Sequence, residues 1–151
     1  SGYEHMPTKK EFEDIGSPGE VTDLLIQLYR DDSVPKYQRV KALGALRFFP
    51  EQERARKQFE RVLTDQATSD SARRVAVKAY GFAYDGQAVE LLATLLGHDD
   101  YHTRDAAVRT LIEIDTPDAR KALQKRVDQE PEEAIKQRIA DYLDGDKPAV
   151  K

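Results

Sequence analysis

A four-residue phrase recurs along the chain and constrains the fold more than any other feature. It reads VKAL at 40–43, VKAY at 77–80, VRTL at 108–111 and, in a weaker form, IADY at 139–142. The steps between successive copies are 37, 31 and 31 residues. A period of this length indicates that one supersecondary unit is repeated, and that the units stack to bury apolar faces that none could bury alone.

Each copy lies in a segment with helical spacing of its apolar residues, and further amphipathic segments lie at 21–29, 51–63, 88–96 and 119–127. Alternating β-type runs are missing, so the pattern predicts four helix pairs. Asp70 is expected to cap one second helix, and Thr116-Pro117 to open another helix. Gly44 and Gly81 share one place in the phrase, which favours close helix approach because glycine costs a helix about 1 kcal/mol relative to alanine.

The composition narrows the class of protein. The 151 residues have no cysteine, which excludes thiol catalysis, zinc–cysteine sites and disulfides. Net charge is −4, which argues against a nucleic-acid binder that uses its whole surface. No cofactor is expected, no apolar run is long enough to cross a bilayer, and a monomer is predicted.

The chain divides into three parts. Residues 1–17 are expected to form a lead and a capping helix, in which Phe12 and Ile15 cover the first unit. Residues 18–143 form the repeat domain, and 144–151 a flexible tail. Two explanations of Ser1 to Met6 stay open, a mature exported chain or a vector-derived leader. An exported or periplasmic location is favoured over the cytoplasm.

The stretches LLGHDDYHTRDAAVRTL (95–111), ARRVAVKAYG (72–81) and PKYQRVKALG (35–44) resemble HEAT repeats of the short type found in bacterial proteins. The segment PEEAIKQRIADYL departs most, as a terminal capping repeat does. The resemblance implies an all-α, right-handed α-solenoid of about four helix pairs, with the second helices lining its concave side. It also implies a protein-binding scaffold more often than a nucleic-acid binder or an enzyme.

One basic slot precedes the large apolar residue of each phrase by seven positions and holds Lys36, Arg73 and Arg104. Asp32 and Asp100 stand four residues before the first and third of these. The row could bind anions. The alternative, which the resemblance favours, is a structural ladder in which each basic side chain bonds loop acids and carbonyls.

A second row is expected to face solvent. Lys41, Lys78 and Arg109 share one register beside the apolar stripe, and Tyr37 and Arg74 stand one turn earlier. Stacked helices turn these residues into a strip, and Tyr37 is the aromatic residue expected to be exposed. The strip predicts binding of a protein or peptide of acidic character. The alternatives are binding of a phosphate backbone and a face that is merely solvated.

Catalysis has little support in the sequence. His98 and His102 have a spacing that can hold a metal on a helix, but the aspartates between them indicate a loop and a helix cap. No phosphate-binding loop or nucleophile elbow occurs. The chain is therefore predicted not to be an enzyme, and a HEAT-fold lyase or DNA glycosylase relative is the less favoured alternative.

Overall fold

A computed structural model describes residues 8–145, which fold into paired helices and contain no β-strand. A short helix, α1 (Lys9–Ile15), precedes four pairs: α2 (Pro18–Arg30) with α3 (Lys36–Ala45), α4 (Glu53–Thr64) with α5 (Asp70–Tyr84), α6 (Val89–Thr94) with α7 (Tyr101–Ile114), and α8 (Pro117–Arg126) with α9 (Glu133–Asp144). Single 3-10 turns lie at Leu46–Phe48 (η1), Asp85–Ala88 (η2) and Leu95–Gly97 (η3). The predicted all-α architecture of four helix pairs is confirmed.

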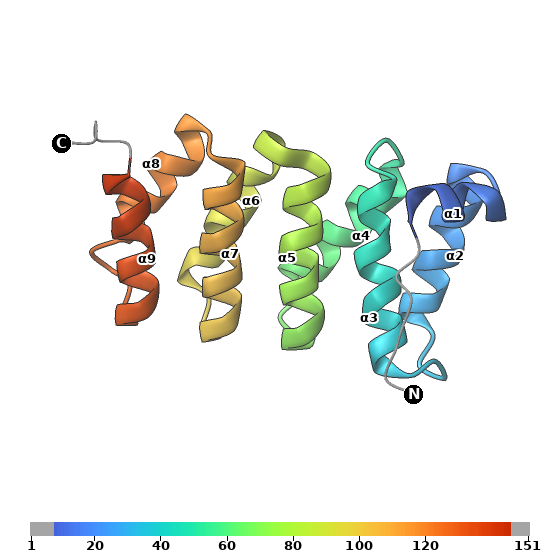
Figure 1. The fold of residues 1–151 in the computed structure, drawn as a ribbon. Coiled ribbons are helices and arrows are strands. Elements are labelled where there is room, and N and C mark those ends of the chain that lie inside the picture. The colour runs from blue at the N-terminus through green and yellow to red at the C-terminus, as the bar shows by residue number, and fades with distance from the viewer. Residues whose placement is uncertain (1–7, 146–151) are drawn as a thin grey trace.

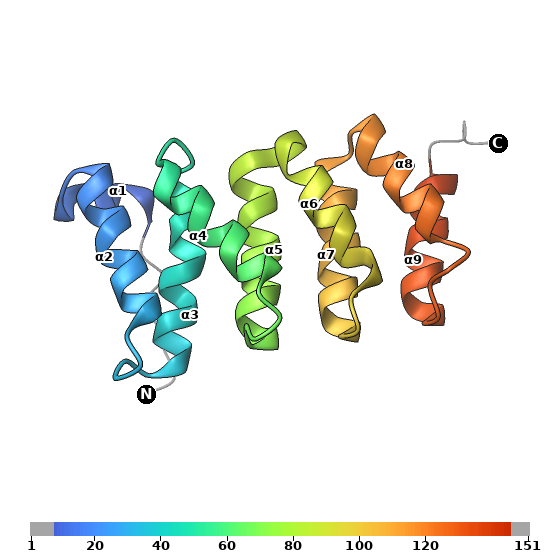
Figure 2. The same ribbon diagram turned by 180° about the vertical axis from the view of Figure 1, so that it is seen from behind.

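The second helix of each pair lies in one layer. In Figure 1, α3, α5, α7 and α9 stand side by side in chain order, and Figure 2 shows α4, α6 and α8 covering the other side. The core lies between the two layers. No helix among residues 8–145 is long and apolar enough to span a membrane.

Side-chain caps fix where the helices begin. Ser17 and Glu20 form a capping box at the start of α2, with both hydrogen bonds at 3.2 Å. Thr116 accepts from the backbone N–H of Ala119 at the start of α8. The prediction for α5 was wrong by one residue: Ser69 is the cap, accepting from Ala72 N at 3.3 Å, and Asp70 is the first helical residue.

The structural correspondence between α3 and α5 differs by three residues from the alignment of their sequence phrases. Val77 and Tyr80 are buried on α5, and their counterparts are buried Leu43 on α3 and Leu46 at the start of η1. Val40, the phrase partner of Val77, is partly exposed. The structural step from α3 to α5 is therefore 34 residues, not 37, whereas buried Val77, Val108 and Ile139 keep the step of 31.

Both glycines of the phrase lie where neighbouring second helices approach closely, as predicted. A Cβ atom on Gly44 would lie 3.1 Å from Cγ1 of Val75 on α5, and one on Gly81 would collide with the side chain of Thr110 on α7. The two glycines are not equivalent positions of the repeat, however, because with a step of 34 residues the equivalent of Gly81 is Arg47.

Helix α1 covers the N-terminal end of the array. Phe12 is buried, with its ring centroid 6.1 Å from that of Phe48 and 6.2 Å from that of Phe49. Ile15 was predicted to join this contact, but it is 64% exposed. The helix ends at Ile15, so that side chain points off the final turn into solvent. The predicted lead before residue 8, including Ser1 to Met6, and the tail from residue 146 lie outside the described residues.

Candidate functional site: the face of the second helices

Two arginines of the predicted ladder bond their own interhelical loops. Arg73 is buried on α5, and its guanidinium donates to Oδ1 of Asp70 and to the carbonyl of Thr68, both at 2.7 Å. Arg104 is buried on α7 and donates from Nη1 to the carbonyls of His98 and Asp99 at 3.0 and 3.1 Å. These bonds occupy the guanidinium groups with backbone carbonyls, so they serve the fold.

Arg104 also reaches into the next unit. Its Nε donates to Oε1 of Glu130 at 3.1 Å, and the Glu130 side chain is 0% exposed. Glu130 also accepts from Arg126 at 3.4 Å and from the backbone N–H of Glu132 at 2.8 Å. The sequence interpretation missed Glu130. The repeat spacing could have pointed to it, because Glu130 precedes Pro131 in a predicted loop and lies 31 residues after Asp99, an acidic residue of the previous loop.

The first position of the ladder needs a correction. Lys36 is exposed, and it is Arg39 that donates from Nε to the carbonyl of Val34 at 3.0 Å and pairs with Asp32 at 3.6 Å. The reason is the 34-residue step, which makes Arg39 the equivalent of Arg73.

Asp100 belongs to the cap of α7. It accepts from the backbone N–H and the hydroxyl of Thr103 at 2.9 and 2.8 Å. Burial by itself would raise the pKa of Asp100, but these hydrogen bonds outweigh burial and lower it. His98 Nδ1 accepts from the Asp100 N–H at 3.0 Å, which is a loop contact. Residues 8–145 contain no group of three His, Cys, Asp or Glu side chains placed to hold a metal.

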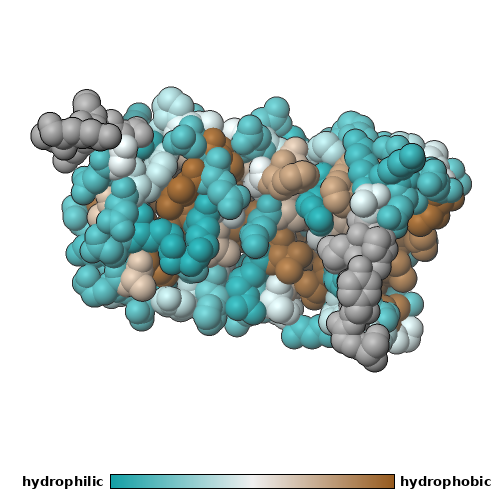
Figure 3. Space-filling model, viewed as in Figure 1, coloured by the Kyte–Doolittle hydropathy of each residue, from teal (hydrophilic) through white to brown (hydrophobic). Residues whose placement is uncertain are grey.

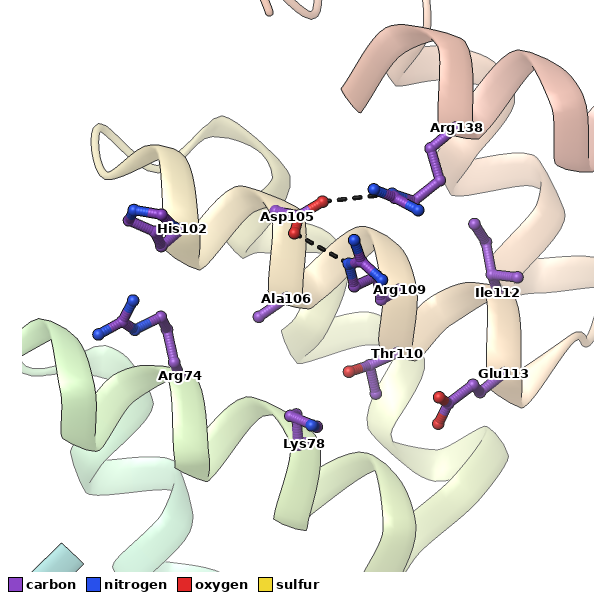
Figure 4. A pocket seen from close by; sticks show the side chains of 10 residues that line it. All are labelled: Arg74, Lys78, His102, Asp105, Ala106, Arg109, Thr110, Ile112, Glu113 and Arg138. Atoms are coloured by element: carbon purple, nitrogen blue, oxygen red, sulfur yellow. Dashed lines mark hydrogen bonds and ion pairs between the residues drawn. The ribbon is translucent and has the colours of Figure 1, made fainter. Parts of the chain in front are cut away.

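A pocket of about 470 Å³ lies between α5 and α7 and extends to α9 (Figure 4). Four cations and two carboxylates line this α5–α7 pocket: Arg74, Lys78, Arg109, Arg138, Asp105 and Glu113. The surplus of cations makes the pocket attractive to acidic groups.

The four cations of the α5–α7 pocket differ in whether a carboxylate of the protein already pairs with them. Asp105 accepts from Nε of Arg109 at 2.9 Å and pairs with Nε of Arg138 at 3.3 Å (Figure 4). Arg74 and Lys78 have no hydrogen bond or ion pair with any of the described residues. These two α5 cations are the ones available to a ligand.

The structure brings three of the five predicted strip residues together, namely Arg74, Lys78 and Arg109. Tyr37 and Lys41 do not line this pocket, because they lie on α3, which is on the opposite side of α5 from α7 (Figure 1). The 34-residue step also sets them three residues out of register with Arg74 and Lys78. Tyr37 is 52% exposed, as expected, and its hydroxyl accepts from Gln38 at 3.2 Å.

A second pocket of about 380 Å³ lies between α3 and α5 and is largely apolar. Gly44, Val75, Ala79 and Phe82 contribute to it, and Lys78 and Glu113 line both pockets. In Figure 3 brown, apolar side chains gather between α3 and α5, within a mostly hydrophilic face. We call this the α3–α5 pocket; it adjoins the α5–α7 pocket through the two shared residues.

Phe82 is an exposed aromatic residue that the sequence interpretation missed. Tyr37 is the aromatic residue that the sequence predicted to be exposed, and Phe82, at 67%, is more exposed than Tyr37, at 52%. Its ring lies edge-on to Phe48 at 6.4 Å, and the guanidinium of Arg47 lies 4.3 Å from the Phe48 ring centroid and 5.9 Å from that of Phe82. An exposed aromatic ring is thus held in place beside the two pockets.

A comparison with models of protein families identifies the repeats of this chain. A family model described as HEAT repeats matches residues 60–144, which is more than half of the chain. A search of curated proteins finds no match. The matched segment runs from within α4 to the end of α9 and includes every residue of the α5–α7 pocket.

Proposed function

Because this chain belongs to the HEAT-repeat family, we propose that it is a non-enzymatic scaffold that binds another protein through the face formed by α3, α5, α7 and α9. HEAT repeats generally mediate protein–protein interaction. Stacked repeats present an extended surface of side chains that the core does not need, which suits the recognition of a macromolecule.

The observation that carries the proposal is the pair of unneutralised cations on α5. Arg74 and Lys78 have no acidic partner in residues 8–145, whereas Arg109 and Arg138 in the same pocket share Asp105. A ligand carboxylate placed there forms charge-assisted bonds without first displacing an internal partner. An acidic protein segment is therefore the expected ligand.

Charge reversal tests the proposal. The variant Arg74→Glu/Lys78→Glu is compared with the wild type and with Lys57→Glu/Lys121→Glu, which makes a similar change in net charge at exposed lysines of α4 and α8. Each protein is used to capture partners from a native extract. The wild type and the control should recover the same partner, and the α5 variant should lose it. Equal recovery by all three proteins contradicts the proposal.

The cationic pocket also makes nucleic acid a second candidate. Phosphate contacts release counterions, so binding to DNA or RNA falls steeply as salt rises. Retention of the wild type on DNA at low salt, with a steep slope of log affinity against log salt that the α5 variant reduces, supports this alternative. Absence of retention at low salt removes it.

A further inference from the structure

We infer that the ligand of this face is an extended segment carrying an apolar side chain and a carboxylate about three residues apart, the first seated beside Phe82 and the second on Arg74 and Lys78. This inference rests on the proposed function and names the chemistry of its partner. It is carried by the contact between the two pockets and by the exposure of Phe82.

Phe82 is not required by the core. Its equivalents one and two repeats later are Glu113 and Asp144, both exposed. The slot therefore tolerates a charged side chain in this same fold. A phenylalanine that is 67% exposed in such a slot contributes its area to a partner more than to folding.

The ring of Phe82 is also held before any ligand arrives. Phe48 meets it edge-on at 6.4 Å, and Phe48 in turn lies 6.1 Å from buried Phe12. Arg47 is fixed by a hydrogen bond from Nη1 to the carbonyl of Gly44 at 2.8 Å and lies beside both outer rings. Ordering costs on binding are lower for a side chain already held in place, and aromatic anchors of this kind dominate binding energies.

The spacing follows from the positions of the two anchors along α5. The α3–α5 pocket and the α5–α7 pocket are successive grooves that meet at Lys78 and Glu113. Phe82 lies four residues after Lys78 and eight residues after Arg74 on α5, which corresponds to about 6 and 12 Å along the helix axis, and an extended chain advances about 3.3 Å per residue. A segment lying along α5 thus needs about two to four residues, or about three on average, to pass from Phe82 to these two cations.

The charge pattern sets which end is acidic. The α5–α7 pocket has four cations against two carboxylates. The α3–α5 pocket has two cations against Glu113, and one of these cations, Arg47, is already bonded to the carbonyl of Gly44; its other lining is mainly apolar, from Val75, Ala79 and Phe82. The apolar side chain therefore belongs toward α3 and the carboxylate toward α7. Glu113, shared by both pockets, disfavours a carboxylate beside it and favours a small or basic residue between the two anchors.

A random peptide display library panned on the full chain tests the inference. The enriched sequences should combine an apolar residue with Asp or Glu at about the stated separation. Binding of the most enriched synthetic peptide, followed by fluorescence anisotropy, should weaken at least about tenfold in Phe82→Ala and in Lys78→Glu. The matched controls Leu24→Ala and Lys57→Glu, at exposed sites on α2 and α4, should bind as the wild type does.

The outcomes separate this inference from the proposed function. Loss of binding in Lys78→Glu with full binding in Phe82→Ala, or enrichment of acidic peptides without an apolar residue, overturns the two-anchor segment and leaves an acidic ligand in place. Binding that neither variant weakens, or no enrichment on the wild type, contradicts both.

Discussion

Replacing Glu130 with glutamine should destabilise the protein far more than replacing Asp70 with asparagine. Both carboxylates pair with a buried arginine of the loop ladder, Glu130 with Arg104 and Asp70 with Arg73. The carboxylates differ in burial, since the Glu130 side chain is 0% exposed and that of Asp70 is 61% exposed. The two substitutions therefore compare the same kind of pair in two environments.

The magnitude follows from that difference. Removing one partner of a buried ion pair lowers the free energy of unfolding by about 3–5 kcal/mol, because the other charge stays buried without compensation. Glutamine keeps one oxygen that can accept from Arg104 or from the Glu132 N–H, which reduces the expected loss for Glu130→Gln to about 2–4 kcal/mol. Arg73 is buried, but Asp70 is reached by water and Arg73 keeps its bond to the Thr68 carbonyl, so the loss for Asp70→Asn should stay near the upper end of the range for solvent-accessible pairs, about 1 kcal/mol.

Urea denaturation followed by circular dichroism gives both free energies of unfolding. The midpoint should fall for Glu130→Gln with an unchanged slope, and its melting temperature should fall by about 5–15 °C for a chain of this size. Added salt should shrink the effect of Asp70→Asn and leave that of Glu130→Gln nearly unchanged, because screening acts on exposed charges. Equal losses in the two variants, or a loss below about 1 kcal/mol for Glu130→Gln, would refute the reasoning.

Three further predictions concern packing and ionisation. Gly81→Ala should lose about 1–3 kcal/mol in urea denaturation, since its Cβ collides with Thr110, whereas Gly97→Ala, with no atom within 4 Å of the new Cβ, should change stability by less than about 0.5 kcal/mol; similar values would contradict the close approach. Burial raises the pKa of Tyr84 to about 12, so the neutral phenol stabilises the fold. That contribution is complete below the unfolded pKa near 10 and is lost as pH rises through the folded value, and Tyr84→Phe should flatten the fall in stability over this range; an unchanged profile would reject the assignment. Phe12→Ala should cost about 2–4 kcal/mol by urea denaturation and deprotect amides of α1 in hydrogen exchange, and unchanged exchange would show that α1 does not cap the array.

Much of the architecture was accessible from the sequence because its signals are local. The recurring phrase predicted the number of helix pairs, and the order of first and second helices followed from the apolar spacing. The Ser69 cap was missed by one residue because serine and aspartate are both good caps and stand next to each other.

The candidate site was only partly accessible. Arg74, Lys78 and Arg109 meet as the repeat predicted, since α5 and α7 keep the 31-residue step. Tyr37 and Lys41 are not in the same register as Arg74 and Lys78. The apolar residues of a helix recur about every three residues, so a sequence comparison can align Val77 with Val40 or with Leu43 equally well, and the structure shows that Leu43 is the equivalent.

The sequence by itself determined that this chain is a stack of helix pairs with basic residues on its second helices, because periodicity and helix caps are properties of neighbouring residues. Only the tertiary structure decided the 34-residue step, the burial of Glu130 against Arg104 and the exposure of Phe82. Each of these depends on the distance by which one helix is offset along its axis from the next. Packing across the interface fixes that distance, through contacts such as the one between Gly44 and Val75.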